Sequence, residues 1–134
     1  MSQPPHPGTL RVTEYARNAS WVVAAEGELD AQTLPPLQQA LEAAAASRPV
    51  VVFDASGVPF ADSSTLNLLL TINHVTALRI AGAQSQLLRV LEMTGADRAL
   101  ALFPTLADAC KAAAEASSQE RYGENRSGSE EASW

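Results

Sequence analysis

The apolar positions of this sequence fall into short runs that are separated by polar or glycine-containing links. The runs at 10–15 (LRVTEY) and 21–26 (WVVAAE) are β-prone, and the polar link between them predicts a hairpin. The run at 48–56 (RPVVVFDAS) has consecutive Val and Phe residues, which predicts a central strand covered on both faces. The runs at 76–82 and 99–103 predict two further strands.

The segments between these strands carry apolar residues at helical spacing. A first helix is expected to begin near Thr33, because Pro35 and Pro36 are tolerated only in a first helical turn. Its apolar positions are Leu37, Leu41 and Ala44. A second helical pattern covers about 64–70.

Two more helices are predicted towards the C-terminus. Ser85 is a candidate N-cap for the third helix, which Gly95 would end. The apolar positions of that helix are Leu87, Leu88, Leu91 and Met93. The fourth follows the last strand, with Thr105 as N-cap and Asp108 at the third helical position. Three β-α-β crossovers then indicate an α/β domain with about four helices and one mixed sheet, whose first hairpin is antiparallel and whose later strands are parallel.

The predicted domain covers residues 9–115, which is enough chain for one buried core. Residues 1–8 are Pro-rich and are expected to form a flexible N-terminal arm. Residues 116–134 are rich in Ser and Glu with almost no aliphatic residues, so we expect a disordered acidic tail.

Charge and cysteine content exclude several classes of protein. The formal net charge is −6 and Lys and Arg do not cluster, which argues against a nucleic-acid surface. Cys110 is the only cysteine, so no internal disulfide is expected, and its alanine-rich surroundings favour a small apolar role.

No apolar run approaches the roughly 18 residues of a membrane helix, and the first residues do not resemble a signal peptide. A cytoplasmic protein without membrane association is expected.

The sequence matches no enzyme template. His6 and His74 are the only histidines, so paired zinc ligands are not expected, and there is no G-x-S-x-G, GxGxxG or Walker motif. His74 is too far along a helix from Ser64 to be its general base. Asp54 and Asp62 flank the loop after the central strand, where capping and solvation are favoured over a Mg²⁺ site. We expect neither catalysis nor a cofactor.

The stretch VPFADSSTLNLLL (58–70) places three hydroxyls beside a carboxylate at the start of the second helix. A helix cap is one interpretation. The other is a modification site, since open α/β sheets present functional groups where their strands end. A helix N-terminus favours an added anion, and a phosphate there would change the charge of any docking surface.

Three segments together resemble the STAS family, and within it the bacterial anti-sigma factor antagonists. They are GELDAQT, VVVFDASGVPFADSSTLNLLL and RVLEMTGADRALALFPTLADA, and the resemblance covers about 10–112. The strand that ends in Asp and is followed by S-G-V, an aromatic residue and D-S-S is the most specific element.

The resemblance implies a phosphorylation switch at Ser64, the second serine of the D-S-S motif. Asp62 would shape the recognised turn, Ser63 would be a cap or secondary acceptor, and Asp30 would be an acidic position near the phosphorylation loop. The implied partners are an anti-sigma factor, which is a serine kinase of the histidine-kinase-like ATPase type, and a PP2C-type phosphatase. The unphosphorylated protein would bind the kinase and free a sigma factor.

Two departures from the family pattern affect this site. Thr65 stands where the family commonly has Gly, and it adds a competing hydroxyl to the partner-facing turn. The segment between Ser64 and the strand at 76–82 is shorter than usual, so we expect the second helix to be truncated or to end raggedly near 71–75. These departures favour the alternative function, a STAS scaffold or a subunit of a transport or signalling complex. A third hypothesis, an enzyme or a binder of a small ligand such as a nucleotide, has no motif in its favour.

Overall fold

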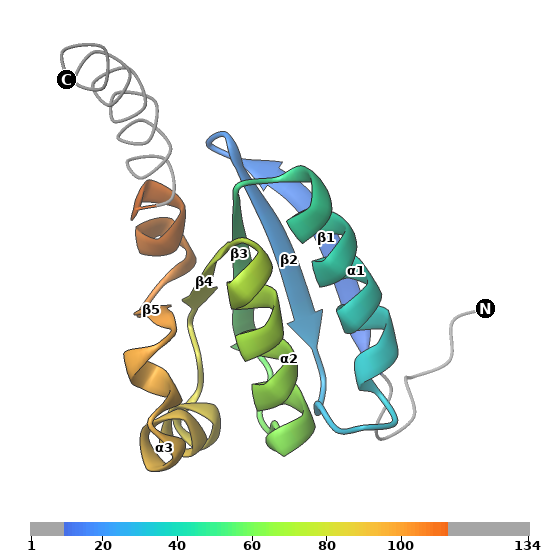
Figure 1. The fold of residues 1–134 in the computed structure, drawn as a ribbon, viewed down its shortest axis with the longest axis vertical. Helices are drawn as coiled ribbons and strands as arrows, with labels where there is room; N and C mark the ends of the chain where they lie inside the picture. Colours follow the sequence, from blue (N-terminus) through green and yellow to red (C-terminus); the bar gives the residue numbers. More distant parts are fainter. Residues whose placement is uncertain (1–9, 113–134) are drawn as a thin grey trace, which may run out of the picture.

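A five-stranded mixed sheet forms the centre of the molecule (Figure 1). The computed structural model describes residues 10–112. The strand order is β1-β2-β3-β4-β5; β1 and β2 are antiparallel, and the other neighbours are parallel. The bounds are Arg11–Arg17 for β1, Ser20–Glu26 for β2, Val50–Gly57 for β3, Ala77–Ala81 for β4 and Ala101–Phe103 for β5. The predicted sheet is confirmed.

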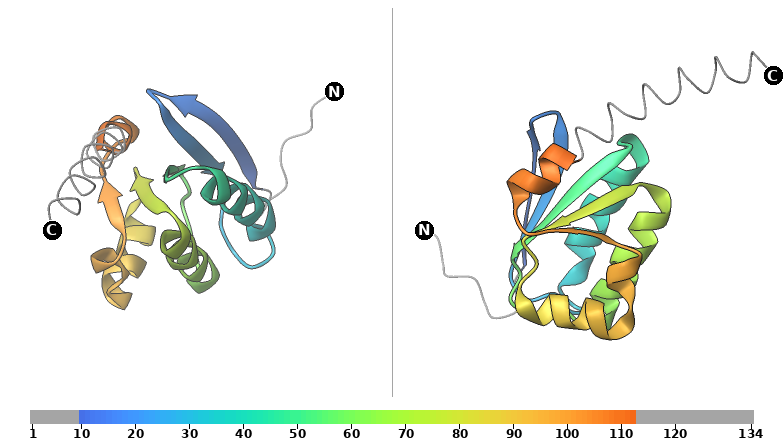
Figure 2. Two further views of the ribbon diagram at one scale, coloured as in Figure 1. Left: turned by 45° about the horizontal axis from the view of Figure 1, so that its top comes forward. Right: turned by 90° about the vertical axis from the view of Figure 1, so that its left-hand side faces the viewer.

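Three helices lie over one face of this sheet and a fourth lies against the other (Figure 2). They are α1 (Leu34–Ser47), α2 (Ser63–Val75) and α3 (Ser85–Thr94), followed by the short 3₁₀ helix η1 (Ala96–Arg98). The last helix begins after β5 and occupies 106–112. None of the helices within 10–112 has the length and apolar character needed to cross a membrane.

The central strand β3 is buried on both faces, as the apolar run predicted. Val51 and Phe53 point into the larger core beneath α1, α2 and α3, while Val50 and Val52 contact the last helix. All four side chains are buried. A strand in this position fixes the loop that follows it, because β2 and β4 hydrogen-bond to its two sides.

The first and last helices begin as predicted. Thr33 is the residue before α1, and both prolines lie in its first turn. The backbone N–H of Asp108 donates to Thr105 Oγ1 at 3.1 Å, which is the predicted cap of the last helix. Cys110 of that helix is buried.

Helix α2 ends within 71–75, where its end was expected, but it extends past the helical pattern predicted at 64–70. The helix has 13 residues and continues to Val75, because Ile72 is buried in the core and Asn73 secures the end of the helix. The Asn73 amide donates to Ala99 O at 3.0 Å and accepts from Leu78 N at 3.3 Å.

Two predictions about α3 are wrong. Gln84, not Ser85, is the N-cap residue, and it makes no side-chain cap bond. Met93 is 79% exposed, whereas Leu87 and Leu91 are buried, so the apolar face of α3 is narrower than predicted. Gly95 ends the helix in a left-handed conformation, as expected (φ 78°). The predicted N-terminal arm and acidic tail lie outside the described residues, as does His6.

Candidate functional site

The segment before α2 is held against the loop that follows β2. Leu29 and Ala61 form an isolated parallel bridge. Leu29 N donates to Phe60 O at 2.8 Å, and Asp62 N donates to Leu29 O at 3.1 Å. This pairing brings the loop containing Asp30 next to the turn containing Asp62, although the two aspartates are far apart in the sequence.

Asp62 caps α2. Its Oδ1 atom accepts the backbone N–H of Ser64 at 3.0 Å and that of Thr65 at 3.3 Å. The backbone of Asp62 is extended, as is usual for an N-cap residue. The cap therefore lies one residue before Ser63, which occupies the first helical position.

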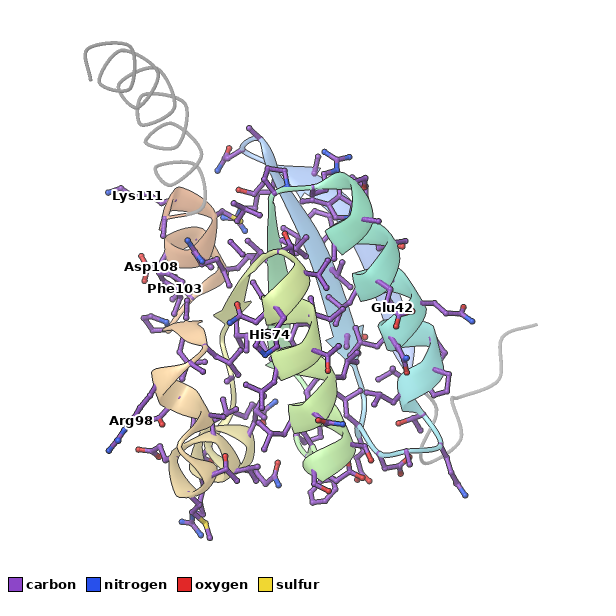
Figure 3. The ribbon with its side chains drawn as sticks, viewed as in Figure 1. Glu42, His74, Arg98, Phe103, Asp108 and Lys111 are labelled. Carbon is purple, nitrogen blue, oxygen red and sulfur yellow. The ribbon has the colours of Figure 1, made fainter. Side chains whose placement is uncertain are left out.

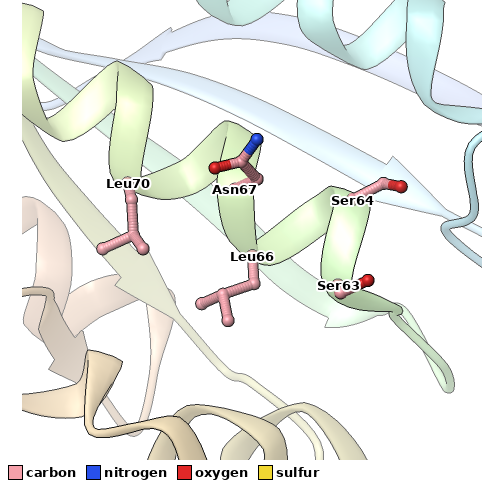
Figure 4. A pocket seen from close by; sticks show the side chains of 5 residues that line it. All are labelled: Ser63, Ser64, Leu66, Asn67 and Leu70. Atoms are coloured by element: carbon pink, nitrogen blue, oxygen red, sulfur yellow. The ribbon is translucent and has the colours of Figure 1, made fainter.

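Both serines of the D-S-S motif lie on the first turn of α2 (Figure 4). Ser63 is exposed and Ser64 is half-buried. They line an open groove of about 380 Å³, together with Leu66, Asn67 and Leu70. Figure 4 shows Leu66 and Leu70 pointing to the same side of the helix. The groove thus combines hydroxyls at the helix start with apolar side chains further along.

Thr65 does not belong to this accessible surface. Its side chain is fully buried, and its Oγ1 atom lies 3.5 Å from Leu29 O, to which it donates. The expectation that Thr65 offers a secondary acceptor or a partner contact is corrected by this burial. Its β-branched side chain fills space beneath the turn, and neither faces a docking partner nor competes with Ser64 for one.

Asp30 shapes its own turn. Its Oδ1 atom accepts from Gln32 N at 2.8 Å and from Thr33 N at 3.0 Å. Thr33 in turn donates from Oγ1 to Glu28 O at 2.8 Å. Asp30 is half-buried. The carboxylate is thus held at the edge of the site by the turn that leads into α1.

The charged group in direct contact with Ser64 is the Asp62 carboxylate. The side chains that line the groove include no basic residue, and Asp62 is bonded directly to the Ser64 backbone. The Asp62 carboxylate already takes the N–H groups of Ser64 and Thr65. A phosphate on Ser64 would therefore meet a carboxylate, and would find fewer free helix N–H donors than a bare helix N-terminus offers.

The other candidate catalytic and metal-binding residues do not form a common site with Ser64. Asp54 Oδ1 accepts from the Ser56 N–H at 3.0 Å and from the Ser56 hydroxyl at 2.7 Å, so it serves its own turn. His74 lies towards the opposite end of α2 from Ser64 (Figure 3), ten residues or about 15 Å along the helix axis. Within residues 10–112, no group of three or more His, Cys, Asp or Glu side chains is arranged to hold a metal ion.

Sequence reasoning missed one neighbour of the site, Gln86, and did not predict how exposed another would be. Phe60, the aromatic residue of the motif, lies just before the turn and is 42% exposed. Gln86 of α3 bonds to the backbone of Ala61 through its side chain. A glutamine that contacts a backbone 25 residues away leaves no periodic signal in a sequence.

The comparisons with known proteins identify the family and the fold. The family described as "Mlab, STAS domain" matches residues 12–106. An anti-sigma factor antagonist from Mycobacterium paratuberculosis has 32% sequence identity and a TM-score of 0.74, over 79% of this chain and 95% of that one. A search of curated proteins found no match.

Two more distant solved structures share the fold. The anti-sigma factor antagonist SpoIIAA in its unphosphorylated form has 14% identity and a TM-score of 0.66, over 80% of this chain and 97% of that one. The STAS domain of a SulP transporter from Vibrio cholerae has 18% identity and a TM-score of 0.57, over 72% and 81% respectively. The same fold therefore occurs both in antagonists and in a transporter.

Proposed function

Because this chain belongs to the STAS domain family, we propose that it is an anti-sigma factor antagonist switched off by phosphorylation of Ser64. The observation that carries the proposal is the D-S-S turn at the start of α2, in a chain that is 32% identical to an anti-sigma factor antagonist. The domain is then a binding partner and a kinase substrate, and it needs neither catalysis nor a cofactor of its own. It would work in the cytoplasm, without nucleic acid or membrane.

The position of Ser64 supports this assignment. The hydroxyl lies on the first turn of α2 and lines the open groove, so a kinase can approach it. Ser63 is an exposed secondary candidate one residue earlier. Asp30 and Asp62 are expected to contribute acidic recognition at the same edge.

Phosphorylation would switch binding off through the negative charge that it adds to the docking surface. Unphosphorylated, the first turn of α2 and its groove dock against the anti-sigma factor, a serine kinase of the histidine-kinase-like ATPase type. Phosphorylation adds roughly −1.5 to −2 charges beside the Asp62 carboxylate. A desolvated like charge in an interface costs several kcal/mol, and about 1.4 kcal/mol is already a tenfold loss of affinity. A PP2C-type phosphatase restores binding.

The test is phosphorylation by the histidine-kinase-like serine kinases of the source genome, each purified and supplied with Mg-ATP. Mass spectrometry should place one phosphoryl group on Ser64. Ser64→Ala should abolish labelling, whereas Ser63→Ala, which changes the adjacent hydroxyl, should leave it. If kinases that label another substrate leave Ser63 and Ser64 unmodified, the proposed switch is wrong.

The alternative is a STAS scaffold or a subunit of a transport or signalling complex that is not phosphorylated. The shared fold of the Vibrio cholerae transporter domain favours it. The two sequence departures, Thr65 and the short segment after Ser64, also favour it, although the buried Thr65 side chain offers no competing hydroxyl at the surface. If Ser64→Asp weakens binding to an anti-sigma factor and Ser64→Ala does not, the switch is favoured over the scaffold.

A further inference from the structure

The backbone at 60–62 has hydrogen-bond partners on both of its sides. On one side, Leu29 accepts from Asp62 N and donates to Phe60 O. In an extended segment, successive residues direct their N–H and C=O groups to opposite sides. The polar backbone atoms of Ala61 therefore face away from Leu29, in the direction of α3.

Gln86 of α3 satisfies both of these atoms. Ala61 N donates to Gln86 Oε1 at 2.8 Å, and Gln86 Nε2 donates to Ala61 O at 2.9 Å. Ala61 is fully buried. In the part of the chain that the structure describes, these are the hydrogen bonds made by the N–H and C=O of Ala61. The glutamine amide thus takes the place of a neighbouring strand.

We propose that Gln86 is a positioning residue for the phosphorylation turn, an inference that rests on the proposed function. Ala61 immediately precedes Asp62, and Asp62 Oδ1 binds the Ser64 backbone. Gln86 therefore fixes the residue that leads into the cap, and the cap fixes the acceptor serine. Through this chain of contacts, α3 determines the orientation of the D-S-S turn without touching Ser64 itself.

Gln84 provides a matched control. It lies two residues before Gln86 and also bonds to a backbone carbonyl through its side chain, because its Nε2 donates to Ser56 O at 2.8 Å. That carbonyl belongs to the end of β3 and not to the turn before α2. Gln84→Met and Gln86→Met remove the amide while keeping a long side chain of similar volume.

The experiment measures phosphorylation kinetics of the full chain with the kinase that labels the wild type. Gln86→Met should lower kcat/KM about tenfold, equivalent to about 1.4 kcal/mol, mainly through KM. Gln86→Glu, which can still accept from Ala61 N but cannot donate to its carbonyl, should fall between the wild type and Gln86→Met. Gln84→Met should keep wild-type kinetics. Equal losses for Gln84→Met and Gln86→Met, or wild-type kinetics for Gln86→Met, would overturn the proposal.

Amide hydrogen exchange tests the positioning role of Gln86 without any kinase. A failure of this proposal can therefore be distinguished from a failure of the proposed phosphorylation of Ser64. In Gln86→Met, the amides of Ser64 and Thr65, which bond to Asp62, should exchange about tenfold faster relative to Val52 of β3. If only Ala61 exchanges faster, Gln86 supports its own contact and does not position the cap, and the inference is overturned. The exchange experiment can be interpreted even if no kinase phosphorylates the wild type.

Discussion

The Asp62 carboxylate and the backbone N–H of Ser64 are joined by a hydrogen bond of 3.0 Å. The group that starts α2 is therefore in direct contact with the residue proposed to be phosphorylated. This contact gives Asp62 two separable roles, because a cap needs only an acceptor oxygen whereas a charge effect needs the carboxylate. Substitutions at this position can distinguish them.

Asp62→Ala should destabilise the domain by about 1 kcal/mol, since the cap of α2 is lost. Asp62→Asn should cost only a few tenths of a kcal/mol, because an asparagine oxygen caps a helix about as well. Urea unfolding followed by tryptophan fluorescence measures both. A large loss for Asp62→Asn would mean that the carboxylate charge, and not the cap bond, stabilises the turn.

A negative charge at residue 64 should couple to the charge at Asp62. Ser64→Asp places a carboxylate beside the cap, so it should be better tolerated in an Asp62→Asn background than in the wild type. We expect a coupling free energy of about 0.5–1 kcal/mol from a double-mutant cycle at low salt, and a smaller one in high salt because exposed charges are screened. A second double-mutant cycle, of Ser63→Asp with Asp62→Asn, measures the coupling free energy at the adjacent exposed position for comparison. Strict additivity for residue 64 would contradict a like-charge contact.

The features predicted correctly are those that local sequence determines. The Val and Phe run of β3 predicted a doubly covered strand, and the prolines before Leu37 predicted the start of α1. At the site, the resemblance predicted that Asp62 shapes the turn, and its carboxylate indeed caps α2. Each of these features involves residues close together in the chain.

The features missed depend on contacts between distant segments. The length of α2 was underestimated because Asn73 near its end is satisfied by Leu78 of β4 and by Ala99, which follows η1. Thr65 was placed on the partner-facing turn because its burial depends on Leu29, 36 residues earlier. A hydroxyl in a D-S-S-T stretch carries no sign of whether it faces solvent or a neighbouring loop.

Thr65→Gly, which restores the residue commonly found in the family, should destabilise this domain. The helix loses only a few tenths of a kcal/mol of propensity, because threonine is itself a poor helix former, but a fully buried side chain is removed, for a total of about 2 kcal/mol. Thr65→Val keeps the shape and should cost less than about 1 kcal/mol, because the lost bond is long at 3.5 Å. Leu29 O also keeps its bond from Asp62 N. Urea unfolding distinguishes the variants, and equal losses would show that the hydroxyl, and not the filled space, is what Thr65 provides.

The thiol of Cys110 should be unreactive in the folded protein. It is buried between the last helix and the second face of the sheet, beside Val22 and Val52. Since the chain has a single cysteine, the thiol reagent DTNB reports on this site alone. We expect labelling at least about a hundredfold slower than in urea-unfolded protein, because it requires local opening worth several kcal/mol.

The rate of that labelling should depend on Ser20, whose hydroxyl donates to Cys110 O at 3.2 Å across the sheet face. Ser20→Ala removes a buried bond worth about 1 kcal/mol, so opening and labelling should be about fivefold faster. Ser47→Ala is the matched control, because among residues 10–112 that hydroxyl bonds within α1, at Ala43 O and Ala44 O. If Ser47→Ala accelerates labelling as much as Ser20→Ala, the reaction reports global unfolding and not release of the last helix. If the folded thiol reacts as fast as the unfolded one, the last helix does not protect this face of the sheet in solution.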